Sequence, residues 1–137
     1  MRNLIKKYAE EGKPIYAECG GLMYLTKSID FGKKKYKMVG LFDAETQMTK
    51  KMTLNYTEGR ITTNCIISSP RKFRAHEFHY SKIRNLPRDA RLVYELKIGE
   101  GISGRKDALF EYNTLASYCH LYFDSAKYAM KLVGGRI

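Results

Sequence analysis

The hydrophobic pattern of residues 1–30 predicts two helices around one short strand. Apolar residues at positions 4, 5, 8 and 9 share one helical face, and Gly12 is a plausible end for this helix. The apolar segment 14–18 is short and predicts a buried strand. Helical spacing then resumes over 20–29, through Leu22, Leu25 and Ile29. A helix, a strand, a tight turn and a second helix form an α/β unit.

The rest of the chain predicts mostly strands. Two β-rich runs over 51–68 flank Glu58-Gly59 and indicate a hairpin. Segment 72–83 alternates imperfectly through Phe73, Ala75, Phe78 and Tyr80. The other expected elements are a strand over 91–98, a glycine-rich turn over 99–107, two strands within 108–123 around a turn at Tyr112-Asn113, and a helix over 124–135 that Asp124 can cap. We therefore expect a mixed sheet, with antiparallel strands added to a parallel core.

Composition limits the class of protein. A chain of 137 residues with 44% hydrophobic residues fits a single globular domain over 1–137. No segment approaches the roughly 20 apolar residues that cross a bilayer. The charged N-terminal segment lacks the apolar centre of a signal peptide. We therefore expect a cytoplasmic protein without a membrane partner.

Net charge and cysteine content bear on possible partners and on disulfide or metal sites. The net charge of +11 is compatible with a nucleic-acid partner, but the basic clusters at 33–37, 49–52 and 70–74 are short and match no known binding module. No nucleic-acid partner is therefore expected. The three cysteines, Cys19, Cys65 and Cys119, form no CxxC pair. This spacing predicts reduced thiols, without a disulfide framework or a metal site.

Cys19 is the first candidate for chemistry, because small residues lie two positions before and two positions after it. A nucleophile elbow requires this pattern, since bulky neighbours would collide with the adjacent strand and helix. The amides of Gly20 and Gly21 would begin the following helix, where they would favour the thiolate and hold an oxyanion. In the alternative interpretation, Cys19 is a small core residue and the glycines only permit close packing. The spacing alone leaves both interpretations open.

A cysteine nucleophile needs a base, and the chain has three histidines. His120 lies at the end of an apolar strand, just before the expected helix, a position where an α/β sheet presents active-site side chains. It could equally be a half-buried structural histidine. His76 and His79 are three residues apart on an expected strand, so their rings should point to opposite faces and not bind one metal.

Three ordered segments resemble one known family. They are YAECGGLMYL (16–25), AHEFHYS (75–81) and LASYCHLYF (115–123), with further similarity at 40–56 and 101–107. They resemble the C-terminal glutamine amidotransferase domain of cobyrinic acid a,c-diamide synthase and of the related nickel-sirohydrochlorin a,c-diamide synthase. The resemblance covers nearly the whole chain.

The resemblance implies an α/β fold of the class I glutamine amidotransferase (flavodoxin-like) type, with three layers and a mixed sheet. It implies that Cys19 is the nucleophile that attacks the side-chain amide of glutamine and that His120 is the catalytic histidine. Many relatives outside this branch of the family carry a glutamate two residues after this histidine, but here the position is Tyr122. A Cys-His dyad is therefore expected. Pocket roles are expected for Glu77, His79 and Tyr80.

The resemblance also implies partners. Ammonia would pass to an ATP-dependent synthetase domain, where ATP and Mg²⁺ would be bound, and would amidate the a- and c-acetate side chains of a tetrapyrrole. The chain contains no GxxxxGK[ST] phosphate loop and none of the first strands of the amidotransferase domain. We therefore expect an N-terminally truncated domain without a cofactor of its own, whose exposed sheet edge could pair two copies. An inactive remnant that only binds a synthetase is the alternative.

Overall fold

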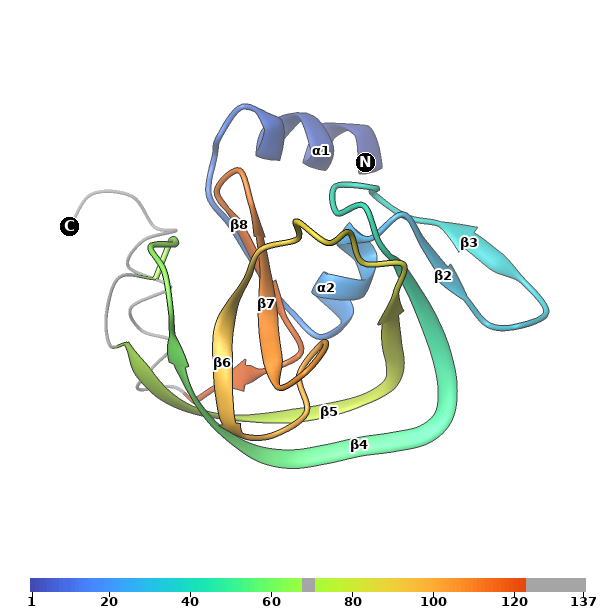
Figure 1. Cartoon of the computed structure of the whole chain (residues 1–137). Helices are drawn as coiled ribbons and strands as arrows, with labels where there is room; N and C mark the ends of the chain where they lie inside the picture. Colours follow the sequence, from blue (N-terminus) through green and yellow to red (C-terminus); the bar gives the residue numbers. More distant parts are fainter. Residues whose placement is uncertain (68–70, 123–137) are drawn as a thin grey trace.

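Strands dominate the computed structural model, which describes residues 1–67 and 71–122 (Figure 1). The predicted helix over 124–135 lies outside the described residues. The elements are α1 (Arg2–Glu10), β1 (Ile15–Glu18), α2 (Gly20–Leu25), β2 (Ser28–Asp30), β3 (Lys35–Lys37), β4 (Glu45–Ile61), β5 (Lys72–Arg84), β6 (Leu92–Ile98), β7 (Lys106–Glu111), β8 (Thr114–Ser117) and β9 (His120–Leu121).

The strands form one mixed sheet, as expected, but its centre is antiparallel, so the predicted parallel core is wrong. Its order is β1-β8-β7-β6-β4-β2-β3, and β5 pairs with both β4 and β9. The pairs β1–β8 and β2–β4 are parallel, while the other pairs are antiparallel. The long strands β4 and β5 curve together around the lower part of the molecule (Figure 1). Their pairing shifts register between Met48 and Thr53, where an irregularity interrupts the ladder.

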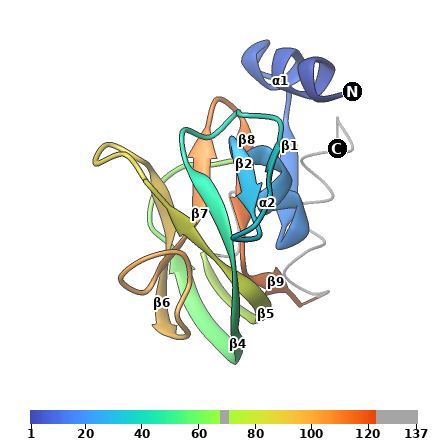
Figure 2. The ribbon, with the colours of Figure 1, turned by 90° about the vertical axis from the view of Figure 1, so that its right-hand side faces the viewer.

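Two hydrophobic clusters cover the two faces of the sheet centre. Neighbouring residues of β7 and β8 alternate between them: Phe110 and Leu115 belong to one cluster, and Leu109 and Ala116 to the other. A strand that is covered on both faces needs apolar residues at consecutive positions, which explains why Thr114–Ser117 is buried throughout. Figure 2 shows α2 beside β1 and β8, on the side of the second cluster.

The first helix agrees with the sequence prediction, but the second is shorter than predicted. The helix α1 ends near Gly12, which adopts a left-handed φ of 76° and donates its N–H to Ala9. The second helix was predicted to reach Ile29, but α2 ends at Leu25. The backbone at Thr26 is extended, and its buried hydroxyl is hydrogen-bonded to Met23 and Thr46. Residues 28–30 then join the sheet as β2.

The predicted hairpin turn at Glu58-Gly59 is wrong, because β4 continues to Ile61. Gly59 lies inside the strand for a packing reason. A Cβ atom there would lie 2.8 Å from the carbonyl oxygen of Glu95 and 2.8 Å from the ring of Phe73. The glycine therefore permits close approach between strands, which local sequence does not distinguish from a turn.

The alternation of β5 is stricter than predicted and partly reversed. Phe73 and Ala75 point into the core as expected, whereas Phe78 and Tyr80 point outward and are 45% and 42% exposed. The buried positions between them belong to Glu77 and His79, which are hydrogen-bonded to each other. Paired polar groups can occupy a core face that apolar patterning would assign to aromatic residues. Within the described residues, no helix is long and apolar enough to span a membrane.

Candidate active site

Cys19 lies at a strained turn between β1 and α2. Its φ is 48° and its ψ is −103°, a backbone conformation that non-glycine residues rarely adopt. Hydrogen bonds hold the turn on both sides: the Cys19 N–H donates to Ser117 at 2.7 Å, and its carbonyl accepts the N–H of Met23 at 3.0 Å. Strain of this kind at a strand-to-helix corner is the geometry of a nucleophile elbow.

The small residues around Cys19 serve the packing of the elbow. A Cβ atom on Gly21 would lie 2.9 Å from the Cβ of Ala17, so the positions two before and two after Cys19 both have to be small. Gly20 has open space around its Cα, and its N–H is directed at the Cys19 sulfur. The close-packing requirement therefore applies to Ala17 and Gly21 but not to Gly20.

The surroundings of the thiol oppose its ionisation. Burial raises the pKa of Cys19, the N–H of Gly20 lowers it, and the nearby Glu18 carboxylate raises it, with a net rise above the ordinary value. The Gly20 amide therefore favours the thiolate, as expected, but burial and the Glu18 carboxylate outweigh it. The Cys19 thiol donates to the carbonyl of Phe78 at 3.4 Å. A thiol of this kind needs a base before it can act as a nucleophile.

His120 is held at the same edge of the sheet. Strands β1 and β8 are parallel, with Glu18 opposite Ser117, so the residues that follow them emerge at one end. His120 Nδ1 lies 3.2 Å from Glu18 Oε2, and Glu18 is the residue before Cys19. The structure therefore brings His120 into contact with the immediate neighbour of Cys19, although the two residues are far apart in the sequence.

A buried carboxylate shapes the segment that leads to His120. Asp107 on β7 is fully buried and accepts the N–H groups of Tyr118 at 3.1 Å and Cys119 at 2.8 Å. Burial raises the pKa of Asp107, although these hydrogen bonds act in the opposite direction. They also draw the chain out of β8 after Ser117, which corrects the prediction that this strand continues through His120. His120 instead starts β9, which pairs with β5.

The outward face of β5 lies beside Cys19 and His120. His76 is opposite His120 in the β5–β9 register, and the two rings stack at 4.9 Å between centroids. Phe78 is next on this face, and its carbonyl accepts the Cys19 thiol. His76 and His79 point to opposite faces, as predicted. Among the described residues, no group of three His, Cys, Asp or Glu side chains could hold a metal ion.

The three residues assigned to a substrate pocket do not share one surface. Tyr80 is exposed, while Glu77 and His79 lie on the buried face. Burial raises the pKa of Glu77, but hydrogen bonds from His79, the Glu100 N–H, Asn55 and the Gly101 N–H outweigh it and lower the pKa to about 2. Glu77 therefore joins β4, β5 and the glycine-rich loop after β6. The pocket role of Glu77, His79 and Tyr80 stays a prediction.

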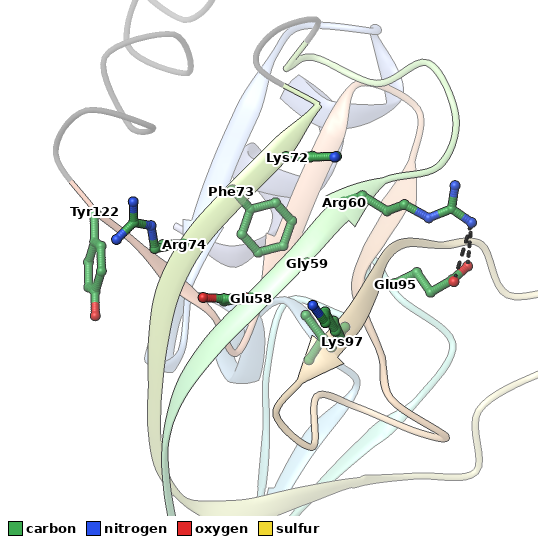
Figure 3. A pocket seen from close by; sticks show the side chains of 10 residues that line it. Glu58, Gly59, Arg60, Lys72, Phe73, Arg74, Glu95, Lys97 and Tyr122 are labelled. Carbon is green, nitrogen blue, oxygen red and sulfur yellow. Dashed lines mark hydrogen bonds and ion pairs between the residues drawn. The ribbon is translucent and has the colours of Figure 1, made fainter.

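An open hollow begins next to the site and runs along β4, β5 and β6 (Figure 3). Its volume is about 860 Å³, and Tyr122, two residues after His120, forms one end. Arg60 and Glu95 form an ion pair at 3.3 Å near the other end. The charged residues that line it are mostly basic: Arg60, Lys72, Arg74 and Lys97, with Glu58 and Glu95.

Two residues of this site were not assigned a role from the sequence. The sequence predicts no role for Glu18, and for His76 it predicts only a ring on the opposite strand face from His79. The available signal for Glu18 was an acidic residue at the end of an apolar strand, directly before the candidate nucleophile. The stacking of His76 on His120 depends on the β5–β9 register, for which the sequence holds no local signal.

Comparison with known proteins identifies the family of this chain. Residues 1–128 match the family model of the CobB/CobQ-like glutamine amidotransferase domain. Proteins named cobyrinate a,c-diamide synthase are 48% identical over 124 residues in Sulfurisphaera tokodaii and 40% identical over 136 residues in Methanosarcina barkeri. These alignments cover 90% and 89% of this chain, but the chain spans only 28% of each relative.

Solved structures support the fold. A crystal structure described as a glutamine amidotransferase superposes with a TM-score of 0.64 at 17% identity, over 98% of this chain and 68% of the other. The PurLQS structure from Thermotoga maritima gives 0.69 at 15% identity, over 94% of this chain and 64% of the other. The expected class I glutamine amidotransferase-like fold is thus confirmed. From its sequence match and its fold, this chain belongs to the family of CobB/CobQ-like glutamine amidotransferase domains.

Proposed function

We propose that this domain is a glutaminase, in which Cys19 attacks the side-chain amide of glutamine and His120 is the base. The observation that supports this most is the strained elbow at Cys19 beside a histidine that contacts the preceding residue, Glu18. A buried structural cysteine does not need a positive φ, and the cost of such a conformation is on the order of 1–3 kcal/mol.

The proposed reaction uses groups that the site provides. His120 takes the proton of the Cys19 thiol, whose raised pKa makes a base necessary at neutral pH. The sulfur attacks the amide carbon, and the Gly20 and Gly21 amides stabilise the oxyanion. The imidazolium of His120 then protonates the leaving amine, which departs as ammonia. Water hydrolyses the resulting thioester and releases glutamate.

We extend the proposal to the whole enzyme from the names of the relatives. The ammonia would pass to a synthetase domain that binds ATP and Mg²⁺ and amidates the a- and c-carboxylates of a tetrapyrrole in cobalamin or coenzyme F430 biosynthesis. Because the chain spans about 28% of these relatives, the synthetase reaction belongs to sequence outside this domain. The partners proposed for this chain are therefore glutamine and the synthetase domain.

Labelling with 6-diazo-5-oxo-norleucine, a reactive glutamine analogue, tests the glutaminase proposal. We expect the full chain to be modified at Cys19, as located by peptide mass spectrometry, and to release glutamate from glutamine. Cys19→Ser and His120→Ala should lose glutamate release. Cys65→Ser is the matched control, because Cys65 is another partly buried free thiol and lies outside the site. Equal labelling of Cys65 or Cys119 would contradict the proposal.

The inactive alternative gives a different result in the same experiments. A remnant that acts only as an interaction module would bind a synthetase domain supplied as a separate chain, with no labelling of Cys19 and no release of glutamate. Turnover by the wild-type chain, lost in Cys19→Ser, excludes this alternative.

A further inference from the structure

We infer that Glu18 is the acidic positioning residue of this site and fixes the orientation and tautomer of His120. This inference rests on the proposed glutaminase function and adds a third member to the expected Cys-His dyad. The family position for such an acid, two residues after the histidine, is occupied by Tyr122, which is partly exposed and lines the adjacent hollow. The acid that contacts the histidine comes instead from the strand that carries the nucleophile.

The contacts of Glu18 lock both oxygens of its carboxylate. Oε2 lies 3.2 Å from His120 Nδ1, and Oε1 accepts the N–H of Leu121 at 3.1 Å. The Tyr16 hydroxyl also donates to Oε1, at 2.5 Å. The side chains of Glu18 and His120 are 26% and 30% exposed, so the pair is partly shielded from water. Groups on β1 and β9 therefore contact both oxygens of the Glu18 carboxylate.

This arrangement determines which nitrogen of His120 can act as a base. An ionised carboxylate only accepts hydrogen bonds, so Nδ1 must carry the proton that Glu18 accepts. The lone pair is then on Nε2, which is the nitrogen that can take a proton from the thiol. When His120 becomes an imidazolium, the Glu18 charge stabilises it. An acid that holds the tautomer in this way contributes about 10⁴-fold to kcat in serine protease triads.

A purely structural role for Glu18 is the competing explanation, because the same carboxylate also ties β9 to β1 through Leu121. Both explanations predict some loss of stability when Glu18 is replaced. Only the positioning role predicts a change in the protonation of the His120 ring. The decisive measurement is therefore spectroscopic and does not depend on turnover.

The test compares Glu18→Gln with the wild-type chain by ¹⁵N NMR of the imidazole nitrogens. The chain has three histidines, and His120→Asn assigns the signals of His120. We expect a protonated Nδ1 in the wild type and a shift toward the Nε2-protonated tautomer in Glu18→Gln. For glutamine hydrolysis we expect kcat to fall by about 10²- to 10⁴-fold with KM nearly unchanged. Glu18→Asp, which retains the charge, should recover part of this loss.

Glu45→Gln is the matched control. Glu45 is 28% exposed in its side chain and also accepts two donors, Lys35 and Asn85, but it lies on β4 away from His120. We expect it to leave the His120 signals and kcat unchanged. The inference is overturned if Glu18→Gln leaves the His120 tautomer as in the wild type, because a fall in kcat without a tautomer change would indicate a structural role only. If the wild-type chain has no glutaminase activity, the proposed function fails, and the tautomer comparison alone decides the role of Glu18.

Discussion

Among single residues, the contact between Ala17 and Gly21 limits which side chains the elbow tolerates. A Cβ on Gly21 would lie 2.9 Å from Ala17, whereas a Cβ on Gly20 meets nothing within 4 Å. Both substitutions to alanine gain helix propensity of up to about 1 kcal/mol. Overpacking costs about 1–3 kcal/mol and applies only to Gly21→Ala. We therefore expect Gly21→Ala to be less stable than Gly20→Ala by about 1–3 kcal/mol in urea unfolding.

A compensating change tests the cause of this difference. Ala17→Gly removes the atom that the new methyl group would meet, so Ala17→Gly/Gly21→Ala should recover the steric part of the loss. Equal stability of Gly20→Ala and Gly21→Ala would show that the elbow does not require a small residue at position 21.

The raised pKa of Cys19 gives a second prediction at this scale. A neutral alkylating agent such as iodoacetamide reacts with the thiolate, so the Cys19 rate should rise with pH and reach its midpoint above the ordinary value. In the urea-unfolded chain, the midpoint should return to about 8.5. Peptide mass spectrometry separates Cys19 from the other thiols. A midpoint in the folded chain below that of the unfolded chain would show that the helix end outweighs burial and Glu18.

At the scale of elements, Glu77 joins β4, β5 and the loop after β6, and this makes the fold sensitive to acid. Its pKa is lowered from 4.5 to about 2 in the folded chain. A carboxyl group with a lowered folded pKa contributes stability above its unfolded pKa and loses it as the pH falls toward the folded value. We expect the free energy of unfolding to fall by on the order of 3 kcal/mol between about pH 5 and pH 2 from this group.

Two variants identify Glu77 as the source of this dependence. Glu77→Gln should lower stability at neutral pH and flatten the profile between about pH 5 and pH 2. If it does not fold, Asn55→Ala removes a single donor to Glu77 and should move the acid transition to higher pH. An unchanged profile in both variants would assign the acid sensitivity to other carboxylates.

The elements also show where local sequence is sufficient. The strand before Cys19, the turn at Tyr112-Asn113 and the start of α2 follow from short-range patterns and are found in the structure. The prediction of a hairpin turn at Glu58-Gly59 was wrong. Gly59 is needed because the strand packs closely against β6, which is distant in sequence. The prediction of which β5 side chains point inward was wrong at two positions, because a hydrogen-bonded Glu77-His79 pair occupies the core there.

For the candidate site, too, the sequence predicted the local features but not the contacts between distant segments. Residue types and spacing indicated Cys19 and His120, and the resemblance to a known family made them a pair. The sequence held no signal that Glu18 would contact His120, since this depends on the parallel register of β1 with β8 and on β9. The departure of the chain from β8 also depends on a buried carboxylate from another strand, Asp107.

In the whole molecule, the site exists only when distant segments are assembled. Cys19 comes from β1 and α2, its thiol contacts β5, and His120 comes from β9. If the chain unfolds in a single transition, as single domains of this size usually do, the site cannot outlast the fold. We expect preferential labelling of Cys19 by 6-diazo-5-oxo-norleucine to disappear at the urea midpoint measured by circular dichroism. Loss at clearly lower urea would instead indicate local opening around α2 or β9.

The net charge of +11 predicts that salt stabilises this fold. The ion pairs of acidic residues with Lys13, Lys27, Lys35 and Arg60 lie at partly or largely exposed side chains, and such pairs contribute about 0–1 kcal/mol each. The excess positive charge repels itself over longer distances, which salt screens as the Debye length falls from about 30 Å at 0.01 M to about 8 Å at 0.15 M. We expect Tm to rise over this range.

The lysines between β2 and β3 provide the variant that tests this balance. Lys33 and Lys34 are exposed, and with Lys35 and Lys37 they form the densest basic cluster of the chain. Replacing both with glutamate removes two positive charges and adds two negative ones, so less repulsion remains for salt to screen. Lys33→Glu/Lys34→Glu should therefore raise Tm at about 0.01 M salt and reduce its rise toward 0.15 M. A Tm that falls with salt in the wild-type chain would mean that its ion pairs outweigh the repulsion.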